Sequence, residues 1–145
     1  MVRLTLAHDR AEMGRLAAWL DAREDQMAIP ARLAFALRQC LEEAVANLIK
    51  HTPVTAGEDI AVELDWQDDT LVAAVEDSAP PFDPRAVPPP VRPATLEDAV
   101  PGGWGIQLIR SFASDIGYET KAGRNRLTMK FVRPATGADA IPKKS

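Results

Sequence analysis

Residues 60–77, IAVELDWQDDTLVAAVED, decide the fold of this chain. They contain two runs of strand length, IAVELDWQ and TLVAAVED, separated by the polar pair Asp68 and Asp69. Apolar runs rich in valine, isoleucine and threonine that are joined by a short polar turn are typical of a β-hairpin. We therefore predict two hairpin-linked strands here, with Asp68 and Asp69 as their turn.

The segments before this hairpin predict one strand and two helices. Residues 2–7 alternate between apolar and polar positions and are expected to form a strand. Residues 9–24 carry apolar side chains at helical spacing, which predicts a first helix. A second helix is expected from Pro30, because proline suits the first helical position, to His51, shortly before Pro53.

The segments after the hairpin predict a further helix and a second hairpin. Residues 102–117, GGWGIQLIRSFASDIG, open with three glycines and continue at helical spacing. Residues 118–122 and 125–132 are expected to close the domain as two strands. This order of elements predicts an α+β fold. We expect a two-layer α/β sandwich with helices on one face of a mixed, mostly antiparallel sheet.

Residues 80–101 have a different character, because they contain eight of the twelve prolines and no glycine. Such a stretch forms neither a regular helix nor a central strand. Connections of this length in small domains are functional lids or disordered segments. We expect one domain over residues 1–133 and a disordered tail over residues 134–145.

The composition is that of an ordinary soluble domain. The chain has 145 residues, of which 46% are hydrophobic and 26% charged, which suits one domain with its own core. Its apolar runs are too short to cross a bilayer and its N-terminus has no secretory leader pattern, so we expect a cytoplasmic protein without a membrane partner. A net charge of -4 gives no electrostatic basis for direct binding of nucleic acid.

Several kinds of site are not indicated by the sequence. The single cysteine, Cys40, rules out an internal disulfide and is interpreted as a small core residue. Two histidines without HExxH spacing argue against a zinc site. The sequence also has neither a Gly-x-Ser-x-Gly motif nor a Walker A motif, so a hydrolase triad and a P-loop are not expected.

The first motif with chemical potential lies in the second helix, in CLEEAVANLIKHT, residues 40–52. A helical wheel gives an apolar stripe and a polar border; the stripe contains Leu37, Leu41, Ala44 and Leu48, and the border contains Gln39, Glu43, Asn47 and Lys50. The border is either a solvated edge or a site. In the second case the Asn47 carbonyl oxygen suits Mg²⁺, and Glu43 suits a general base. Spacing alone leaves both interpretations open.

Two further motifs follow. In VEDSAPPFDP, residues 75–84, a strand ends in Asp77, whose carboxylate could accept a hydrogen bond from an exocyclic amine such as N6 of adenine, or could cap a turn. In PGGWGIQLIR, residues 101–110, three glycines precede a helix. Glycines let the backbone approach an anion and the helix N-terminus favours phosphate, although a flexible hinge would have the same composition.

Together and in this order, the three motifs resemble those of the Bergerat-fold histidine kinase-like ATPase (GHKL) superfamily. EEAVAN is similar to its N box, VEDSA to its first glycine box and GGWGIQLI to its second. More closely, LEEAVANLIKHT, FDP, GGWGIQLIRSFASDIGYE and GRNRLTMKF resemble the anti-sigma factor serine/threonine protein kinases. The resemblance extends from the first strand to Val132.

This resemblance implies an ATP and Mg²⁺ site. Asn47 would hold Mg²⁺ and through it the triphosphate, Glu43 would activate the attacking hydroxyl, and Asp77 would bind the adenine amine. The remaining nucleotide contacts would come from the glycine boxes, at Ala79, Gly102, Gly103, Trp104, Gly105 and Ile106. These roles are carried over from the family and do not follow from spacing.

The resemblance also implies partners. Such a kinase binds a sigma factor and phosphorylates a serine or threonine of an anti-sigma factor antagonist of the STAS type, so it regulates transcription by partner switching. Homodimerisation through the sheet or the first helix is a further family expectation. None of this follows from composition.

Ala79 departs from the family pattern, because the first glycine box has glycine at this position. If the backbone there requires positive φ, alanine costs about 1 kcal/mol or more. The alternative function is therefore a catalytically degenerate module that captures a sigma factor or antagonist without phosphotransfer. Retention of Glu43 and Asn47 favours the kinase.

Two minor expectations concern polar side chains elsewhere. Arg124 and Arg126 flank Asn125 in a stretch interpreted as a hairpin turn with solvated charges. His51, at the end of the second helix, is interpreted as a capping or packing group.

Overall fold

The computed structural model describes residues 1–51, 59–78 and 109–133, with His51 described by its backbone alone. Its elements are β1 (Val2–Leu6), α1 (Glu12–Gln26), α2 (Ala31–His51), β2 (Ile60–Gln67), β3 (Thr70–Asp77), β4 (Asp115–Lys121) and β5 (Arg124–Val132). Residues 109–112 are also helical. The expected order of strands and helices is therefore confirmed for the part of the chain that the structure describes.

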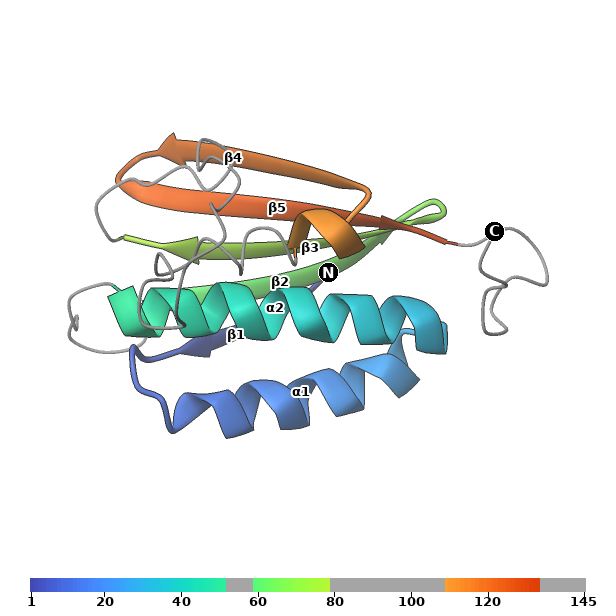
Figure 1. Cartoon of the computed structure of the whole chain (residues 1–145), viewed down its shortest axis with the longest axis horizontal. Helices are drawn as coiled ribbons and strands as arrows, with labels where there is room; N and C mark the ends of the chain where they lie inside the picture. The colour runs from blue at the N-terminus through green and yellow to red at the C-terminus, as the bar shows by residue number, and fades with distance from the viewer. Residues whose placement is uncertain (52–58, 79–108, 134–145) are drawn as a thin grey trace, which may run out of the picture.

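The five strands form one sheet in the order β1-β2-β3-β5-β4. Each of the four neighbouring pairs is antiparallel, so the expected mixed character of the sheet is wrong for the described strands. Helices α1 and α2 lie on the same face of the sheet (Figure 1). The α+β fold with helices covering one face is confirmed.

The central hairpin forms where the sequence predicts it. Gln67 pairs with Thr70, and Asp68 takes φ 55°, a left-handed conformation that aspartate tolerates better than most residues. The backbone N–H of Arg133 donates to the Asp69 carbonyl over 2.6 Å, which connects this turn to the end of β5. The turn is thus anchored to the sheet at its second residue.

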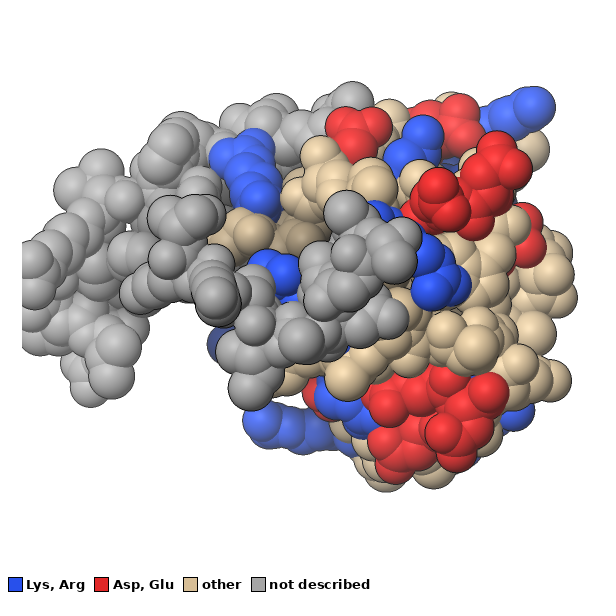
Figure 2. Space-filling view, turned by 90° about the vertical axis from the view of Figure 1, so that its right-hand side faces the viewer, with Lys and Arg blue, Asp and Glu red and all other residues tan. Residues whose placement is uncertain are grey.

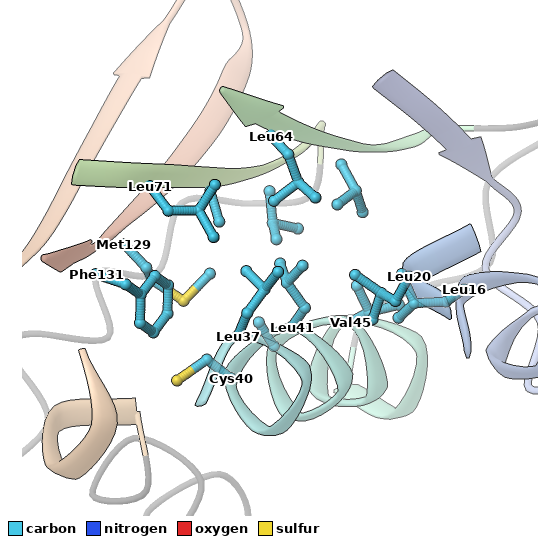
Figure 3. Packing of buried hydrophobic residues seen from close by; sticks show 14 of the residues in the cluster. Leu16, Leu20, Leu37, Cys40, Leu41, Val45, Leu64, Leu71, Met129 and Phe131 are labelled. Carbon is cyan, nitrogen blue, oxygen red and sulfur yellow. The ribbon is translucent and has the colours of Figure 1, made fainter. Parts of the chain in front are cut away.

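The core lies between α2 and the sheet (Figure 3). Leu37, Leu41 and Val45 of α2 are fully buried, facing residues of the central strands such as Leu64 and Phe131. Of the apolar stripe predicted for the second helix, Leu37, Leu41 and Ala44 are buried and Leu48 is partly buried, while Val45 was not predicted. Because such burial is worth about 1.5–3 kcal/mol per large side chain, it fixes the orientation of α2 about its own axis.

Cys40 belongs to this core, as expected. Its side chain is fully buried, and Sγ lies 4.0 Å from the Ile109 carbonyl oxygen, so α2 packs against the helical residues 109–112. Burial raises the pKa of the Cys40 thiol to about 12. The thiol therefore stays protonated and acts as an apolar side chain.

The first helix begins later than predicted. Asp9, the expected first residue, instead accepts hydrogen bonds from Ala11 and Glu12 in a turn, and α1 starts at Glu12. Leu16 and Leu20 bury the inner face of α1. Arg38 of α2 then pairs with Asp21 and Glu24, which ties the two helices together.

The helix predicted over residues 102–117 ends earlier than expected. Helical structure stops at residue 112, and β4 starts at Asp115 rather than at Tyr118. Ile116 and Tyr118 pair with Met129 and Leu127 of β5, so both residues gain ladder hydrogen bonds and an inward-facing position. Strand pairing with β5 therefore overrides the local helical pattern.

The interpretation of residues 124–126 as a solvated turn is wrong. The turn consists of Ala122 and Gly123, with φ 54° and 77°, and glycine is well suited to this conformation. Arg124 and Asn125 are the first two residues of β5. Asn125 is 4% exposed, so an apparently polar turn residue is in fact buried in the sheet.

Charged residues cross the sheet face opposite the helices in alternation, as an ion-pair ladder. Its members, in order of contact, are Arg3, Glu63, Arg126, Glu76, Arg124 and Asp59. Arg126 is central, since its guanidinium lies 2.8 Å from Glu63 and 2.7 Å from Glu76. The ladder links β1, β2, β3 and β5 and covers the small residues Ala61 and Ala74, which are almost fully buried.

Glu63 is the most buried carboxylate of the ladder, with 8% of its surface exposed. Burial alone would raise its pKa, but hydrogen bonds and charge attraction from Arg126 and Arg3 outweigh burial and hold the pKa below the ordinary 4.5. A carboxyl whose pKa is lowered by folding stabilises the fold above its ordinary pKa. That stabilisation is lost as the pH falls through the lower, folded-state value.

Charges elsewhere are mixed in sign. The face of the molecule seen in Figure 2 carries acidic and basic groups close together. None of the helices in the described ranges is long and apolar enough to cross a membrane.

We predict that Glu63→Gln lowers the free energy of unfolding by about 1–3 kcal/mol at about pH 7, because two arginines lose a charged partner. The deficit should begin to shrink below the ordinary value of 4.5, where the unfolded chain takes up a proton, and be lost as the pH falls through the lower pKa of the folded wild type. Urea denaturation at about pH 7 and about pH 3 measures both. Asp21→Asn, at a carboxylate 72% exposed, is the control and should cost little at either pH. A deficit that is independent of pH would contradict the prediction.

Candidate functional site

Three of the residues singled out in the sequence lie in described parts of the chain. Glu43 and Asn47 belong to the C-terminal half of α2, and Asp77 is the last residue of β3. The C-terminal ends of α2 and β3 lie at the same end of the molecule, away from the β2–β3 turn (Figure 1). The fold therefore brings the first two motifs to one end of the sandwich.

The other expected site residues lie outside the described residues. They are Ala79, Gly102, Gly103, Trp104, Gly105 and Ile106. The proline-rich stretch 80–101, the tail 134–145 and the side chain of His51 also fall outside them. Expectations for these positions stay predictions.

Glu43 and Asn47 lie one helical turn apart on α2, so both project from one face of the helix. Both are partly buried, whereas Lys50, one turn further on, is exposed. Ala44 beside them is 6% exposed and belongs to the core. The pair thus lies at the boundary between the core and the surface, where a carboxylate and an amide can reach a ligand while their helix is held rigidly.

The donor set of this pair fits a magnesium ion that arrives with a nucleotide. Within the described ranges, no group of three or more His, Cys, Asp or Glu side chains could hold a metal ion alone. Mg²⁺ does not require such a cage, because it keeps several waters and takes its other ligands from phosphate oxygens. The side-chain carbonyl oxygen of Asn47 can supply the single protein ligand that such an ion needs.

Asp77 is buried, with 4% of its surface exposed, although it ends a strand. It pairs in register with Asn125 of β5, and the Asn125 side-chain amide donates a hydrogen bond to Asp77 Oδ1 over 3.2 Å. The Thr120 hydroxyl of β4 donates in turn to Asn125 Oδ1 over 3.0 Å. Asp77 is therefore the end of a hydrogen-bonded chain across three strands.

Asn125 is the residue that the sequence interpretation missed. A signal was present, because a period of two from Asn125 passes through Leu127, Met129 and Phe131, which are the inward-facing residues of β5. Asn125 therefore begins the inner face of the strand. The neighbouring arginines and Gly123 made the stretch look like a turn instead.

The residue after Asp77 is held by a second carboxylate, which is partly buried. Asp59, just before β2, accepts hydrogen bonds from the Ser78 backbone N–H over 3.0 Å and from its hydroxyl over 2.8 Å. Arg124 donates to the same carboxylate over 2.6 Å and to the Asp59 carbonyl over 2.9 Å. His8 Nε2, on a completely buried side chain, lies 3.3 Å from Asp59 Oδ2. Asp59 thus joins four segments at the end of β3.

The electrostatics of Asp59 follow from these contacts. Burial acts to raise its pKa, but hydrogen bonds from Ser78, His8 and Arg124 outweigh burial and lower the pKa below the ordinary 3.8. The group is therefore a carboxylate at neutral pH, which is the form that accepts several donors at once. It fixes the backbone at Ser78, directly after Asp77.

The fold and the family match together identify the kind of domain. An antiparallel sheet covered on one face by helices places a Glu–Asn pair and a buried aspartate at the same end. The family model for the histidine kinase-like ATPase domain matches residues 6–131. The chain belongs to the histidine kinase-like ATPase family. This match confirms the resemblance inferred from the three motifs.

Relatives of this ATPase domain agree with the assignment. The serine/threonine-protein kinase BtrW of Bordetella bronchiseptica is 34% identical over 102 residues, which are 68% of this chain and 70% of BtrW. The similarity to BtrW relates this chain to serine/threonine kinases within the histidine kinase-like ATPase family. The matched family is an ATPase domain, so ATP is the expected ligand of the site.

Two solved structures share the fold of this ATPase domain. The structure of the RsbU and RsbW domains of Rv1364c from Mycobacterium tuberculosis superposes with a TM-score of 0.66 at 18% identity, over 92% of this chain and 33% of that chain. The histidine kinase AdeS of Acinetobacter baumannii gives 0.51 at 14% identity, over 91% of this chain and 68% of that chain. This chain thus spans about a third of the Rv1364c structure. At these identities the two structures support the fold alone.

We predict that Asp59→Ala destabilises the ATPase domain by about 2–4 kcal/mol, because it leaves Arg124 and the buried His8 without this carboxylate and frees Ser78. Amide hydrogen exchange at Ser78 should accelerate more than at the centre of β3. Urea denaturation and hydrogen exchange measure the two effects.

The matched control is Asp9→Ala, which removes an exposed carboxylate that also accepts from a backbone N–H. It should cost about 0.5–1 kcal/mol and leave Ser78 protected. An equal cost for the two substitutions would show that Asp59 is not a structural anchor.

Proposed function

We propose that this protein is an ATP-dependent serine/threonine protein kinase and anti-sigma factor, which binds a sigma factor and phosphorylates a STAS-type anti-sigma factor antagonist. The observation that carries the proposal is the Glu43–Asn47 pair at the same end of the fold as the buried Asp77. Family membership and the similarity to BtrW, a serine/threonine-protein kinase, support it. The partners come from the resemblance to anti-sigma factor kinases.

In this proposal Asp77 selects the base. Its carboxylate is buried and is held by the hydrogen bond from Asn125, and a carboxylate has enough acceptor sites to take the exocyclic amine of adenine as well. A buried acceptor of this kind discriminates well, because a base without the amine would leave it with one hydrogen bond fewer. The Asp59–Ser78 contact holds the adjoining backbone in place.

Asn47 and Glu43 serve the phosphate end. Bound ATP and Mg²⁺ supply the γ-phosphoryl group and the charge that neutralises it. Asn47 would hold the cation through its amide oxygen. Glu43, one turn earlier on the same rigid helix, would accept the proton of the attacking serine or threonine hydroxyl. The packing of Leu41 and Val45 against the sheet fixes the direction of both side chains.

The second candidate function is a binding module without phosphotransfer. The feature that favours it is Ala79 in place of the glycine of the first glycine box. In this case nucleotide affinity would be low, and only capture of the sigma factor or antagonist would remain. Retention of Glu43 favours the kinase, since a pure binding surface has no need of a base at this position.

We predict that Asn47→Ala weakens Mg²⁺-dependent ATP binding by at least about tenfold, because the ion loses its protein ligand. Binding without Mg²⁺ should change little. Calorimetry with ATP in the presence of Mg²⁺ or a chelator measures both. Gln39→Ala, two turns earlier on the polar border of the same helix, is the control and should bind ATP like the wild type. Absence of wild-type binding at millimolar ATP would favour the binding module.

We predict that Glu43→Ala reduces phosphotransfer to a STAS-domain antagonist by about 10²–10⁴-fold while ATP affinity stays within about threefold, because a base acts on the chemical step and not on binding. Transfer of labelled phosphate, followed at saturating ATP over a panel of STAS-domain proteins from the source genome, measures it. Glu42→Ala is the matched control, since Glu42 lies about 100° away around the helix. Equal activity of wild type and Glu43→Ala would exclude Glu43 as the base.

A further inference from the structure

The hydrogen-bonded chain at the end of β3 has a direction that matters for the site. Asn125 is 4% exposed and pairs with both Asp77 and Thr120 in the strand registers on its two sides. Its amide has one end that accepts and one end that donates. The Thr120 hydroxyl donates to the accepting end, and the donating end faces Asp77 Oδ1.

This arrangement fixes the orientation of the Asn125 amide. If the amide were turned over, its oxygen would face the Asp77 carboxylate and its NH₂ group would face the Thr120 hydroxyl. Two acceptors would then lie about 3 Å apart in a buried place, which is unfavourable because neither is solvated. The Asp77 carboxylate, which can only accept, therefore sets the orientation of the amide, and the Thr120 hydroxyl holds the amide oxygen on the other side.

The residues on either side of Asn125 do not compete for this role. Arg124 donates to Asp59, and Arg126 donates to Glu63 and Glu76 on the outer-face ladder. Alternation along β5 separates these guanidinium groups from the inner face, where Asn125 lies. The strand thus presents a neutral donor, between two arginines, to the aspartate expected to read the base.

We propose that Asn125, held in place by Thr120, is a positioning residue that sets the nucleobase preference of this protein. Its hydrogen bond to Oδ1 fixes the plane of the Asp77 carboxylate and so the direction in which this carboxylate can accept a base amine. A base with a carbonyl in place of the amine would bring its oxygen against a carboxylate oxygen of Asp77, and two acceptors form no hydrogen bond. This inference deepens the proposed function and rests on its assignment of Asp77 as the adenine-binding residue.

The test compares calorimetric affinities for ATP and for inosine triphosphate, which has a carbonyl where ATP has the amine. Wild type should prefer ATP by at least about tenfold. Asn125→Leu, which keeps a similar volume without a hydrogen bond, should reduce the preference to less than about threefold, mainly through weaker ATP binding. Asp77→Asn should abolish the preference for ATP. The double variant Asp77→Asn, Asn125→Leu should show the same ratio of ATP to inosine triphosphate affinity as Asp77→Asn alone.

Thr120→Val removes the hydroxyl that holds the Asn125 amide, without a large change in packing. It keeps the proposal testable if Asn125→Leu does not fold. It should reduce the preference for ATP by about three- to tenfold. Thr128→Val makes the same change at a residue two positions from Arg126 on β5 and should leave the preference unchanged. A Thr120→Val protein that keeps the full wild-type preference would overturn the role of Thr120.

The outcomes separate this inference from the proposed function. If the folded Asn125 and Thr120 variants lose affinity for both nucleotides equally, their role is structural and the inference is overturned while the kinase proposal stands. If wild type binds neither nucleotide, both fail. If the preference depends on Asn125 and Asp77 but no phosphotransfer is found, the inference is supported and the kinase proposal is not.

Discussion

The apolar stripe of α2 packs along the middle of the sheet, and the position of every candidate residue in the described chain depends on this contact. Leu37, Leu41 and Val45 are fully buried against strands that come from both halves of the sequence. A helix held in this way cannot rotate without exposing its leucines to water. Glu43 and Asn47 lie beside the stripe, so burial of their neighbours determines where they point.

β5 has two separate roles, one on each face of the sheet. Its inward-facing Asn125 donates to Asp77, and its outward-facing Arg124 donates to Asp59, which in turn holds Ser78. Consecutive residues of one strand therefore act, from opposite faces of the sheet, on the last residue of β3 and on the residue that follows it. This explains why a strand end, which is often frayed, can present a buried carboxylate in a defined direction.

The kinase and binding-module proposals share this framework and differ in what it is used for. A base and a cation ligand on a rigid helix are useful for phosphoryl transfer, where catalysis is mainly positioning and electrostatics. Partner capture alone needs neither. Hydrogen bonds lower the pKa values of two carboxylates, from Ser78, His8 and Arg124 at Asp59 and from Arg126 and Arg3 at Glu63. These carboxylates belong to the fold and not to the reaction.

The sequence by itself determined the elements with strong local patterns: the hairpin 60–77, the helix ending at His51 and the polar border with Glu43 and Asn47. These patterns depend on neighbours within one or two turns, so a linear reading captures them. It gave a wrong end for the helix before β4 and a wrong setting for Asn125. Only the tertiary structure decided that Asn125 meets Asp77, 48 residues away, and that Asp59 meets Ser78. The reason is physical, because strand pairing brings distant residues together. The register of the strands, and not local spacing, determines which side chain lies next to a carboxylate.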